Sequence, residues 1–287
     1  MTVLSHPDRE ERSSHFQQSI KVLSNRPIRL AGSFFLLALV FRVVDIFILE
    51  MNETDFGILP SKVIPIILIL LYLRKTGRNI SEIGIHKGSL GNNVVLGILA
   101  VLFFNGILIG GTFLTLVTLG FNSYFSIYKL DYLTYDLVFQ TANAFMEEML
   151  FRGLILVCFM SVMRPIRANI LQGFVFGLWH VVWPINSYLG GLINLGAAIS
   201  WSLEYVLSSM LIGLLFGYMY QRTNSLIGPI FFHFFVNLAS VYVNVEPSIT
   251  IVRLALGALA LILTLIAIRF LTKKHQIMMA DLKDTKE

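Results

Sequence analysis

The side chains best suited to chemistry in this sequence lie in stretches that are otherwise apolar. Glu147 and Glu148 are adjacent, and Arg152 is the only other charged residue between Leu137 and Met160. A charged side chain near the centre of a bilayer costs about 2.5–3.5 kcal/mol on insertion scales, so these three predict a polar interior or a water-filled cavity. At about 100° per residue, Glu148 and Arg152 share a helix face and can pair, which leaves Glu147 free for chemistry.

Two further apolar stretches contain histidines. His180 ends the run that begins at Phe176, and His233 precedes Asn237 by four residues, which places that pair on one helix face. A carboxylate can take a proton from water that an imidazole orients, and an imidazole with a carboxamide can donate hydrogen bonds to an oxyanion. The pattern predicts hydrolysis by water that Glu147 and His180 activate, with His233 and Asn237 stabilising the tetrahedral intermediate.

The same residues admit other interpretations. Ion pairs and hydrogen-bonded histidines also hold membrane helices together, so a purely structural cluster stays open. The alternative function is a non-proteolytic immunity or transporter-like membrane protein, in which the polar cluster binds a peptide or relays protons. Substitution of Glu147 and His180 separates these hypotheses, because only a hydrolase loses cleavage.

The composition indicates that these residues are held in a membrane. The chain of 287 residues is 56% hydrophobic and 14% charged, which predicts an all-α, polytopic membrane helix bundle. Its single cysteine, Cys158, excludes an intrachain disulfide and a cysteine-rich metal site. Runs long enough to cross about 30 Å of hydrocarbon predict about eight transmembrane helices. They lie at 30–49, 58–73, 91–119, 136–161, 165–184, 196–219, 225–245 and 250–270.

The Lys and Arg residues in the tails, in the loops and near the ends of these runs predict the orientation of the bundle. Seventeen lie on the side of the two termini, whereas only Lys62, Lys129 and Arg253 lie on the other. The positive-inside rule therefore places both termini in the cytoplasm. We expect a cytoplasmic tail at 1–28, a membrane domain at 29–271 with its catalytic core at about 136–242, and a cytoplasmic tail at 272–287. The net charge of +5 fits topology and contact with anionic lipid, and no basic stripe indicates nucleic-acid binding.

Three motifs carry a resemblance to a known family, in order along the chain. They are Glu147-Glu148-Met-Leu-Phe-Arg152 (EExxxR), Phe176-Gly-Leu-Trp-His180 (FxxxH) and His233-Phe-Phe-Val-Asn237 (HxxxN). The sequence resembles the CPBP family of type II CAAX prenyl endopeptidases and their bacteriocin-processing or self-immunity relatives. The resemblance implies intramembrane proteolysis. It assigns the same roles as above to Glu147, His180, His233 and Asn237, with Glu148 and Arg152 as supporting residues.

The resemblance leaves the metal, the substrate and the access route open. The family is labelled as metalloproteases, although a metal-free glutamate mechanism has been inferred for its prenyl endopeptidases. Zinc would need Glu147, His180 and His233 to converge to about 2 Å from one ion, and no HExxH motif is present. The expected substrate is a lipidated C-terminal tail or a membrane-proximal peptide such as a bacteriocin leader. The short loops suggest a prokaryotic cytoplasmic membrane, and the prenyl endopeptidases imply a cavity open to the cytoplasm.

Other polar residues receive mostly structural interpretations. We expect Arg42 and Asp45 to form a self-neutralising pair within the first helix. Glu204 is expected to pair with Arg152, to line the cavity or to lie near a helix end. The aromatic segment at 121–135 is expected to be an interfacial belt or a lid, and Asn143 lies one turn before Glu147.

The depths of the motif residues in the bilayer do not agree if the helices are upright. At about 1.5 Å per residue, Glu147 lies about 25 Å from Arg164 and His233 lies about 14 Å from Asn224. The two side chains therefore meet only if the helices are tilted or staggered, or if the expected helix ends are wrong.

Overall fold

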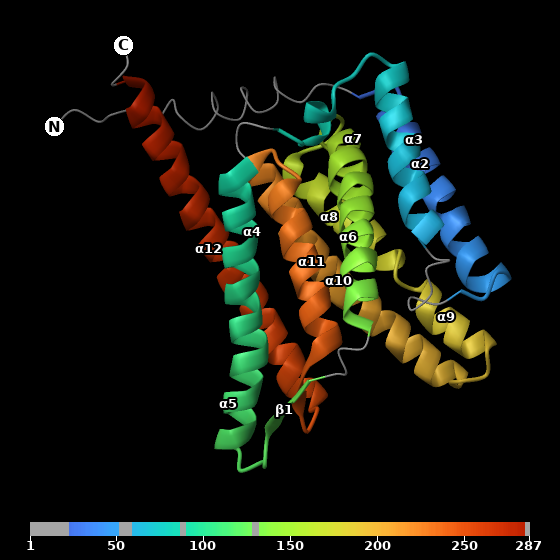
Figure 1. Cartoon of the computed structure of the whole chain (residues 1–287), viewed down its shortest axis with the longest axis vertical. Helices are drawn as coiled ribbons and strands as arrows, with labels where there is room; N and C mark the ends of the chain where they lie inside the picture. Colours follow the sequence, from blue (N-terminus) through green and yellow to red (C-terminus); the bar gives the residue numbers. More distant parts are fainter. Residues whose placement is uncertain (1–22, 52–58, 87–89, 128–131, 285–287) are drawn as a thin grey trace.

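The computed structural model describes residues 23–51, 59–86, 90–127 and 132–284, with 59–60 and 274–284 described by their backbone alone. Most of the N-terminal tail expected at 1–28 and the residue Lys129 therefore lie outside the described residues. The fold is a bundle of helices, and both ends of the described chain lie at the same end of it (Figure 1). We call this the terminus end.

The described chain consists of helices and two short strands. The first are α2 (Pro27–Val43) with its π-helical continuation η1 (Val44–Ile48), α3 (Leu59–Lys75), η3 (Ile80–Ile83), α4 (Leu90–Asn105), η4 (Gly106–Gly110), α5 (Gly111–Thr118) and β1 (Tyr124–Ile127). They are followed by α6 (Leu133–Glu148), η6 (Met149–Leu156), α7 (Val157–Met160), α8 (Pro165–Leu178), α9 (Val182–Leu189), α10 (Leu195–Thr223), α11 (Ile227–Tyr242), β2 (Val243–Glu246) and α12 (Thr250–Asp284).

The structure confirms the prediction of a helical, polytopic membrane bundle. Within the described ranges, five helices are long and apolar enough to cross a membrane, and α11 is a shorter apolar helix. The remaining two predicted spans are also helical: α3 has 17 residues, and the helix from α6 to α7 carries the charged motif. The span predicted at 165–184 lies within the candidate membrane span Pro165–Leu189, which a turn at 179–181 divides into α8 and α9.

Local sequence explains several helix ends. Pro27 and Pro165 each stand in the first turn of a helix, where a missing N–H costs nothing. The Oδ1 atom of Asn194 accepts a hydrogen bond from the backbone N–H of Ala197 and caps α10. Asn224 ends the same helix in the left-handed conformation. These signals fix the long helix α10, one wall of the site.

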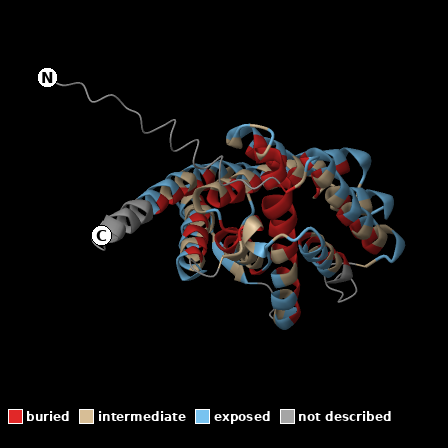
Figure 2. Ribbon diagram, turned by 90° about the horizontal axis from the view of Figure 1, so that it is seen from above, coloured by how far each residue is buried: buried red, intermediate tan, exposed pale blue. Residues whose placement is uncertain are grey.

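The helix running from α6 through η6 to α7 is the centre of the bundle. Every residue of Met149–Leu156 is buried, and Figure 2 shows buried residues gathered in the middle of the molecule. This helix carries Glu147, Glu148 and Arg152, and charged side chains within a membrane face the interior of the bundle, which explains this position. The π-helical register of η6 begins directly after Glu148. Such segments occur often at functional sites.

Helices α8 and α10 approach closely at glycines. A Cβ atom on Gly177 would lie 2.5 Å from the carbonyl oxygen of Val206, and one on Gly213 would lie 3.3 Å from the Cα atom of Gly173. Gly173 and Gly177 are spaced as in the GxxxG motif, as are Gly213 and Gly217. Small residues at this spacing let membrane helices pack backbone to backbone. This contact holds the end of α8 against α10, and His180 lies in the turn that directly follows α8.

The aromatic segment at 121–135 contains a short strand. Strand β1 pairs with β2 in an antiparallel sheet, with Phe125 opposite Val245, at the end of the bundle opposite the termini (Figure 1). The sheet joins the segment after α5 to the segment after α11. Helical periodicity does not predict this pairing.

Candidate functional site

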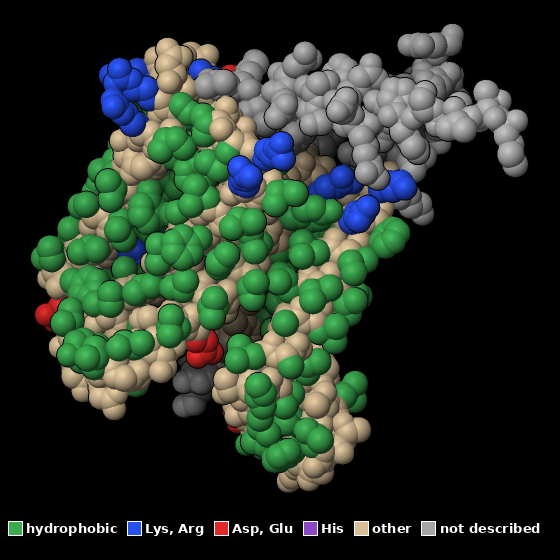
Figure 3. Space-filling model, turned by 180° about the vertical axis from the view of Figure 1, so that it is seen from behind, with side chains coloured by type: hydrophobic (Ala, Val, Ile, Leu, Met, Phe, Trp, Pro, Cys, Tyr) green, Lys and Arg blue, Asp and Glu red, His purple; other side chains and the backbone are tan. Residues whose placement is uncertain are grey.

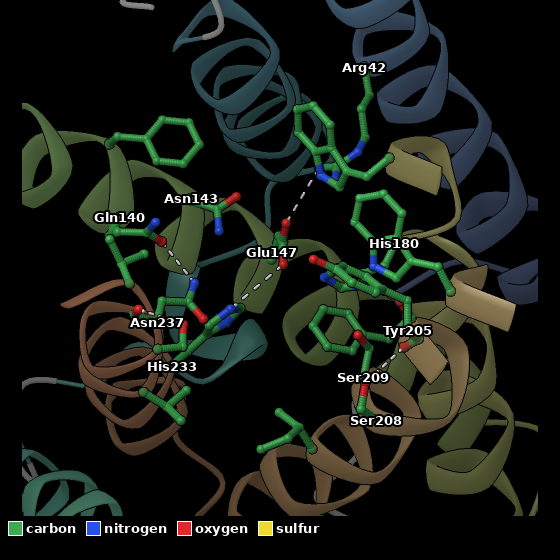
Figure 4. A pocket seen from close by; sticks show the side chains of 18 of the residues that line it. Arg42, Gln140, Asn143, Glu147, His180, Tyr205, Ser208, Ser209, His233 and Asn237 are labelled. Carbon is green, nitrogen blue, oxygen red and sulfur yellow. Dashed lines mark hydrogen bonds and ion pairs between the residues drawn. The ribbon is translucent and has the colours of Figure 1, made fainter. Parts of the chain in front are cut away.

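The structure brings together all four residues that the sequence assigns to catalysis. Glu147, His180, His233 and Asn237 line one cavity of about 710 Å³. Figure 4 shows Glu147 between His180 on one side and the two residues of α11 on the other. The expected stagger is present, because α7 extends further toward the terminus end than the start of α11 (Figure 1).

The two oxygens of Glu147 have different surroundings. The indole N–H of Trp179 donates a hydrogen bond to Oε1 at 2.9 Å. Two cations, Arg42 Nη1 and Lys62 Nζ, each lie 3.7 Å from the same atom. In contrast, Oε2 lies 3.8 Å from His233 Nε2 and has no hydrogen-bond partner among the described residues. One oxygen is therefore held in place, whereas the other is buried without a hydrogen-bond partner among the described residues.

Glu148 and Arg152 form the predicted pair, although η6 departs from α-helical register. Arg152 Nη1 donates to Glu148 Oε1 at 2.8 Å, and both side chains are 0% exposed. The same oxygen lies 2.8 Å from His233 Nδ1. Because a carboxylate only accepts, Nδ1 carries the proton and Nε2 is directed toward Glu147. Glu148 therefore orients the imidazole of His233.

The His180 imidazole is oriented by backbone. Its Nδ1 atom lies 2.8 Å from the carbonyl oxygen of Phe176, one helical turn earlier. A carbonyl only accepts, so Nδ1 donates, and in the neutral ring Nε2 is then an acceptor. The ring also packs edge-on against Phe176, with centroids 4.8 Å apart. The first and last residues of the FxxxH motif thus contact each other.

Asn237 is positioned by Gln140 on α6. The Nδ2 group of Asn237 donates to Gln140 Oε1 at 2.8 Å, which leaves the second amide hydrogen for another acceptor. Gln140 and Asn143 both line the cavity, and Asn143 lies one turn before Glu147, as expected. The role of Gln140 was not predicted, although its spacing of seven residues from Glu147 places it on the same helix face.

Three contacts of Glu147 were missed or misread from the sequence. From the sequence, no functional role was assigned to Trp179. Arg42 was expected to pair with Asp45, and its contact with Glu147 was not predicted. Lys62 was counted among the surface charges, yet its side chain is 1% exposed and lies inside the bundle. The position of Trp179 next to His180 in the FxxxH motif was the available signal.

Glu204 has only one of its expected surroundings. It is exposed and is not among the residues that line the cavity, and Arg152 pairs with Glu148. Its place in the first half of α10 fits the expectation of a residue near a helix end.

Zinc ligation would need several donor groups around one point. Among the described residues, no three His, Cys, Asp or Glu side chains are grouped to hold a metal ion. Arg42 and Lys62 also lie close to the only carboxylate that lines the cavity. Like charges at such distances repel, so these cations oppose a divalent ion at Glu147.

The fold and the site define a class: a multi-pass membrane protein with a carboxylate, two imidazoles and a carboxamide around one cavity. Residues 129–239 match the family model described as type II CAAX prenyl endopeptidase, Rce1-like. This match is to the family that the three motifs predicted, and it covers less than half of the chain. Neither the curated proteins nor the solved structures gave a match to the chain. Helices α2, α3 and α12 lie outside the matched segment.

Proposed function

We propose that this protein is an integral membrane endopeptidase in which Glu147 activates a water molecule. The observation that carries the proposal is the asymmetry of the Glu147 carboxylate. Trp179, Arg42 and Lys62 hold Oε1, whereas Oε2 is buried beside His233 without a hydrogen-bond partner among the described residues, and the proposal places the reacting water there. A base held in this way meets the geometric requirement for proton abstraction.

The proposed reaction proceeds in two steps. Water gives one proton to Glu147 Oε2, and its other hydrogen is oriented by a hydrogen bond to His180 Nε2. The water oxygen attacks the carbonyl carbon of the scissile peptide. The resulting oxyanion accepts hydrogen bonds from Asn237 Nδ2 and from His233 Nε2, the latter when that ring carries both protons. The proton on Glu147 then passes to the leaving nitrogen as the C–N bond breaks, which restores the carboxylate.

The proposal contains no metal step. Its support is the pair of cations at Glu147 Oε1. The whole charge of the carboxylate is balanced by side chains of this chain. A zinc-dependent reaction is the competing proposal, and metal content measured together with activity tests it.

The proposed substrate is a peptide next to the bilayer. The family match supports a protein or peptide substrate, and the finer choice lies between a lipidated C-terminal tail and a membrane-proximal precursor such as a bacteriocin leader. A prokaryotic cytoplasmic membrane and a part in self-immunity or bacteriocin processing belong to the same proposal.

The test compares membranes and medium from cells that carry the native chain, Glu147→Gln or His180→Ala. We expect one or more peptides to appear only with the native chain, because general base catalysis contributes about 10²–10⁴-fold. His180→Ala is the safer variant for folding, since the ring's polar contact is a backbone carbonyl. Glu204→Gln is the matched control, an exposed acid of α10. Unchanged cleavage in both site variants would leave a binding or immunity role.

A further inference from the structure

The cavity occupies one half of the bundle. On α6 its lining residues run from Phe139 to Glu147, and on α11 they run in the opposite chain direction from His233 to Val241. On α10 they lie between Trp201 and Ile212, and α9 contributes as well. Each helix contributes its part nearer α9 and β1, away from the terminus end (Figure 1). Glu147 and His233 therefore lie at the inner limit of the cavity.

The other half of the bundle, toward the terminus end, is filled. Leu150, Leu154, Tyr220 and Leu226 are 0–1% exposed and belong to one apolar core. The loop after α3 covers this core, because Gly84 accepts a hydrogen bond from the backbone N–H of Leu226 at 2.8 Å. Side chains therefore separate Glu147 from the terminus end.

The cavity has an exposed rim between α10 and α11. Ser208 on α10 and Ser240 and Val241 on α11 are exposed and line the cavity, whereas Glu147 is 1% exposed. We call these three residues the mouth. Trp201 and Tyr205 on α10 also line the cavity. The mouth thus opens in the half of the bundle away from the termini.

The exposed charges differ between the two ends. Arg74, Lys75, Arg164, Arg167 and Arg269 are exposed at or near the terminus end, and Figure 3 shows Lys and Arg gathered there. At the opposite end, Arg253 is the exposed cation among the described residues, since Lys62 is buried. By the positive-inside rule, the terminus end faces the cytoplasm and the mouth faces the other side of the membrane.

We propose that the substrate enters from the side of the membrane opposite the cytoplasm. Its class is then an exported peptide, or the outer membrane-proximal segment of a membrane protein, rather than a cytoplasmic lipidated tail. This inference rests on the proposed peptidase function and narrows its substrate. The lining is largely aromatic and hydroxylic, with Arg42 and Glu147 as its charged residues besides histidine, so it suits uncharged side chains around the scissile bond.

The access route can be tested by thiol labelling, because Cys158 is the only cysteine and is buried. In a Cys158→Ala background, Ser208→Cys and Ser240→Cys place a thiol at the mouth. Thr76→Cys places one at an exposed position of the terminus end. A membrane-impermeant maleimide is added either to intact cells or to inverted membrane vesicles.

We expect both mouth cysteines to be labelled in intact cells and Thr76→Cys to be labelled only in inverted vesicles. Labelling of the mouth cysteines only in inverted vesicles would overturn the inference. The inference would also be overturned if the mouth cysteines were labelled neither in intact cells nor in inverted vesicles, although they react fully in the denatured protein.

A second measurement separates this inference from the proposed function. Labelling needs no catalysis, so its outcome stands even if the Glu147→Gln variant shows no loss of cleavage. If cleavage is lost in that variant but the mouth labels from the cytoplasm, the peptidase proposal survives and the access proposal fails. Where both hold, a maleimide adduct formed on Ser208→Cys in intact cells should abolish cleavage, and the same treatment of Thr76→Cys should not.

Discussion

Replacing Arg152 alone should destabilise this protein more than replacing Arg152 and Glu148 together. The two side chains are 0% exposed and joined at 2.8 Å. Removing one partner of a buried ion pair costs about 3–5 kcal/mol, because the remaining charge is left without compensation, whereas replacing both by neutral groups is far less costly. The comparison thus isolates the effect of an unpaired charge.

The contacts of each residue set the size of the effect. In Arg152→Met, Glu148 keeps only the hydrogen bond from His233, and methionine fills much of the space between Phe176 and Phe216. We expect a loss of about 3–5 kcal/mol in the free energy of unfolding. With Glu148→Gln added, the amide oxygen still accepts from His233, and the loss falls to about 1–2 kcal/mol, as for one or two hydrogen bonds.

The measurement is unfolding of the purified protein in mixed micelles with increasing denaturing detergent, followed by tryptophan fluorescence. Arg78→Met is the matched control, because Arg78 and Glu82 form an ion pair at 2.9 Å with the same spacing near the surface. Exposed pairs contribute about 0–1 kcal/mol. The reasoning is refuted if the double variant loses as much stability as the sum of its single variants, or if Arg152→Met costs no more than Arg78→Met.

Three further predictions concern the site, the packing and the metal. Trp179→Phe keeps an aromatic ring but removes the donor to Glu147, so kcat should fall by about tenfold or more; an unchanged kcat would contradict the anchoring role. Gly177→Ala places a methyl group against the Val206 carbonyl and should cost about 1–3 kcal/mol of stability, whereas Gly32→Ala, with no atom within 4 Å, should not destabilise. Removal of metals by chelation, verified by metal analysis of the protein, should leave the cleavage rate unchanged, and loss of cleavage that zinc restores would favour the metal mechanism.

The helices and the motif residues were predictable because their signals are local. Apolar runs long enough to span a bilayer gave the helices, and the four-residue spacings of Glu148 with Arg152 and of His233 with Asn237 put each pair on one face. The end of α8 was missed because Trp179, His180 and Val181 are as compatible with a helix as with the turn that they form.

The unpredicted contacts join residues far apart in the chain. Arg42 and Lys62 meet Glu147 across 105 and 85 positions, and no local pattern reports such a pairing. The expectation of a pair between Arg42 and Asp45 came from helix spacing and did not consider a partner on another helix. The close approach of α8 and α10 did have a signal in the spacing of Gly173 and Gly177, which only the structure made plain.

The buried charges also show why the family-matched segment needs the helices before it. Among the described residues, the buried charged side chains are Arg42, Asp45, Lys62, Glu147, Glu148 and Arg152. The last three lie within the matched segment and carry one net negative charge, and the first three carry one net positive charge. An uncompensated charge in a low-dielectric interior is costly, so the two groups stabilise each other. Because Arg42 and Lys62 supply this balance at the oxygen that Trp179 holds, helices α2 and α3 are part of the candidate site.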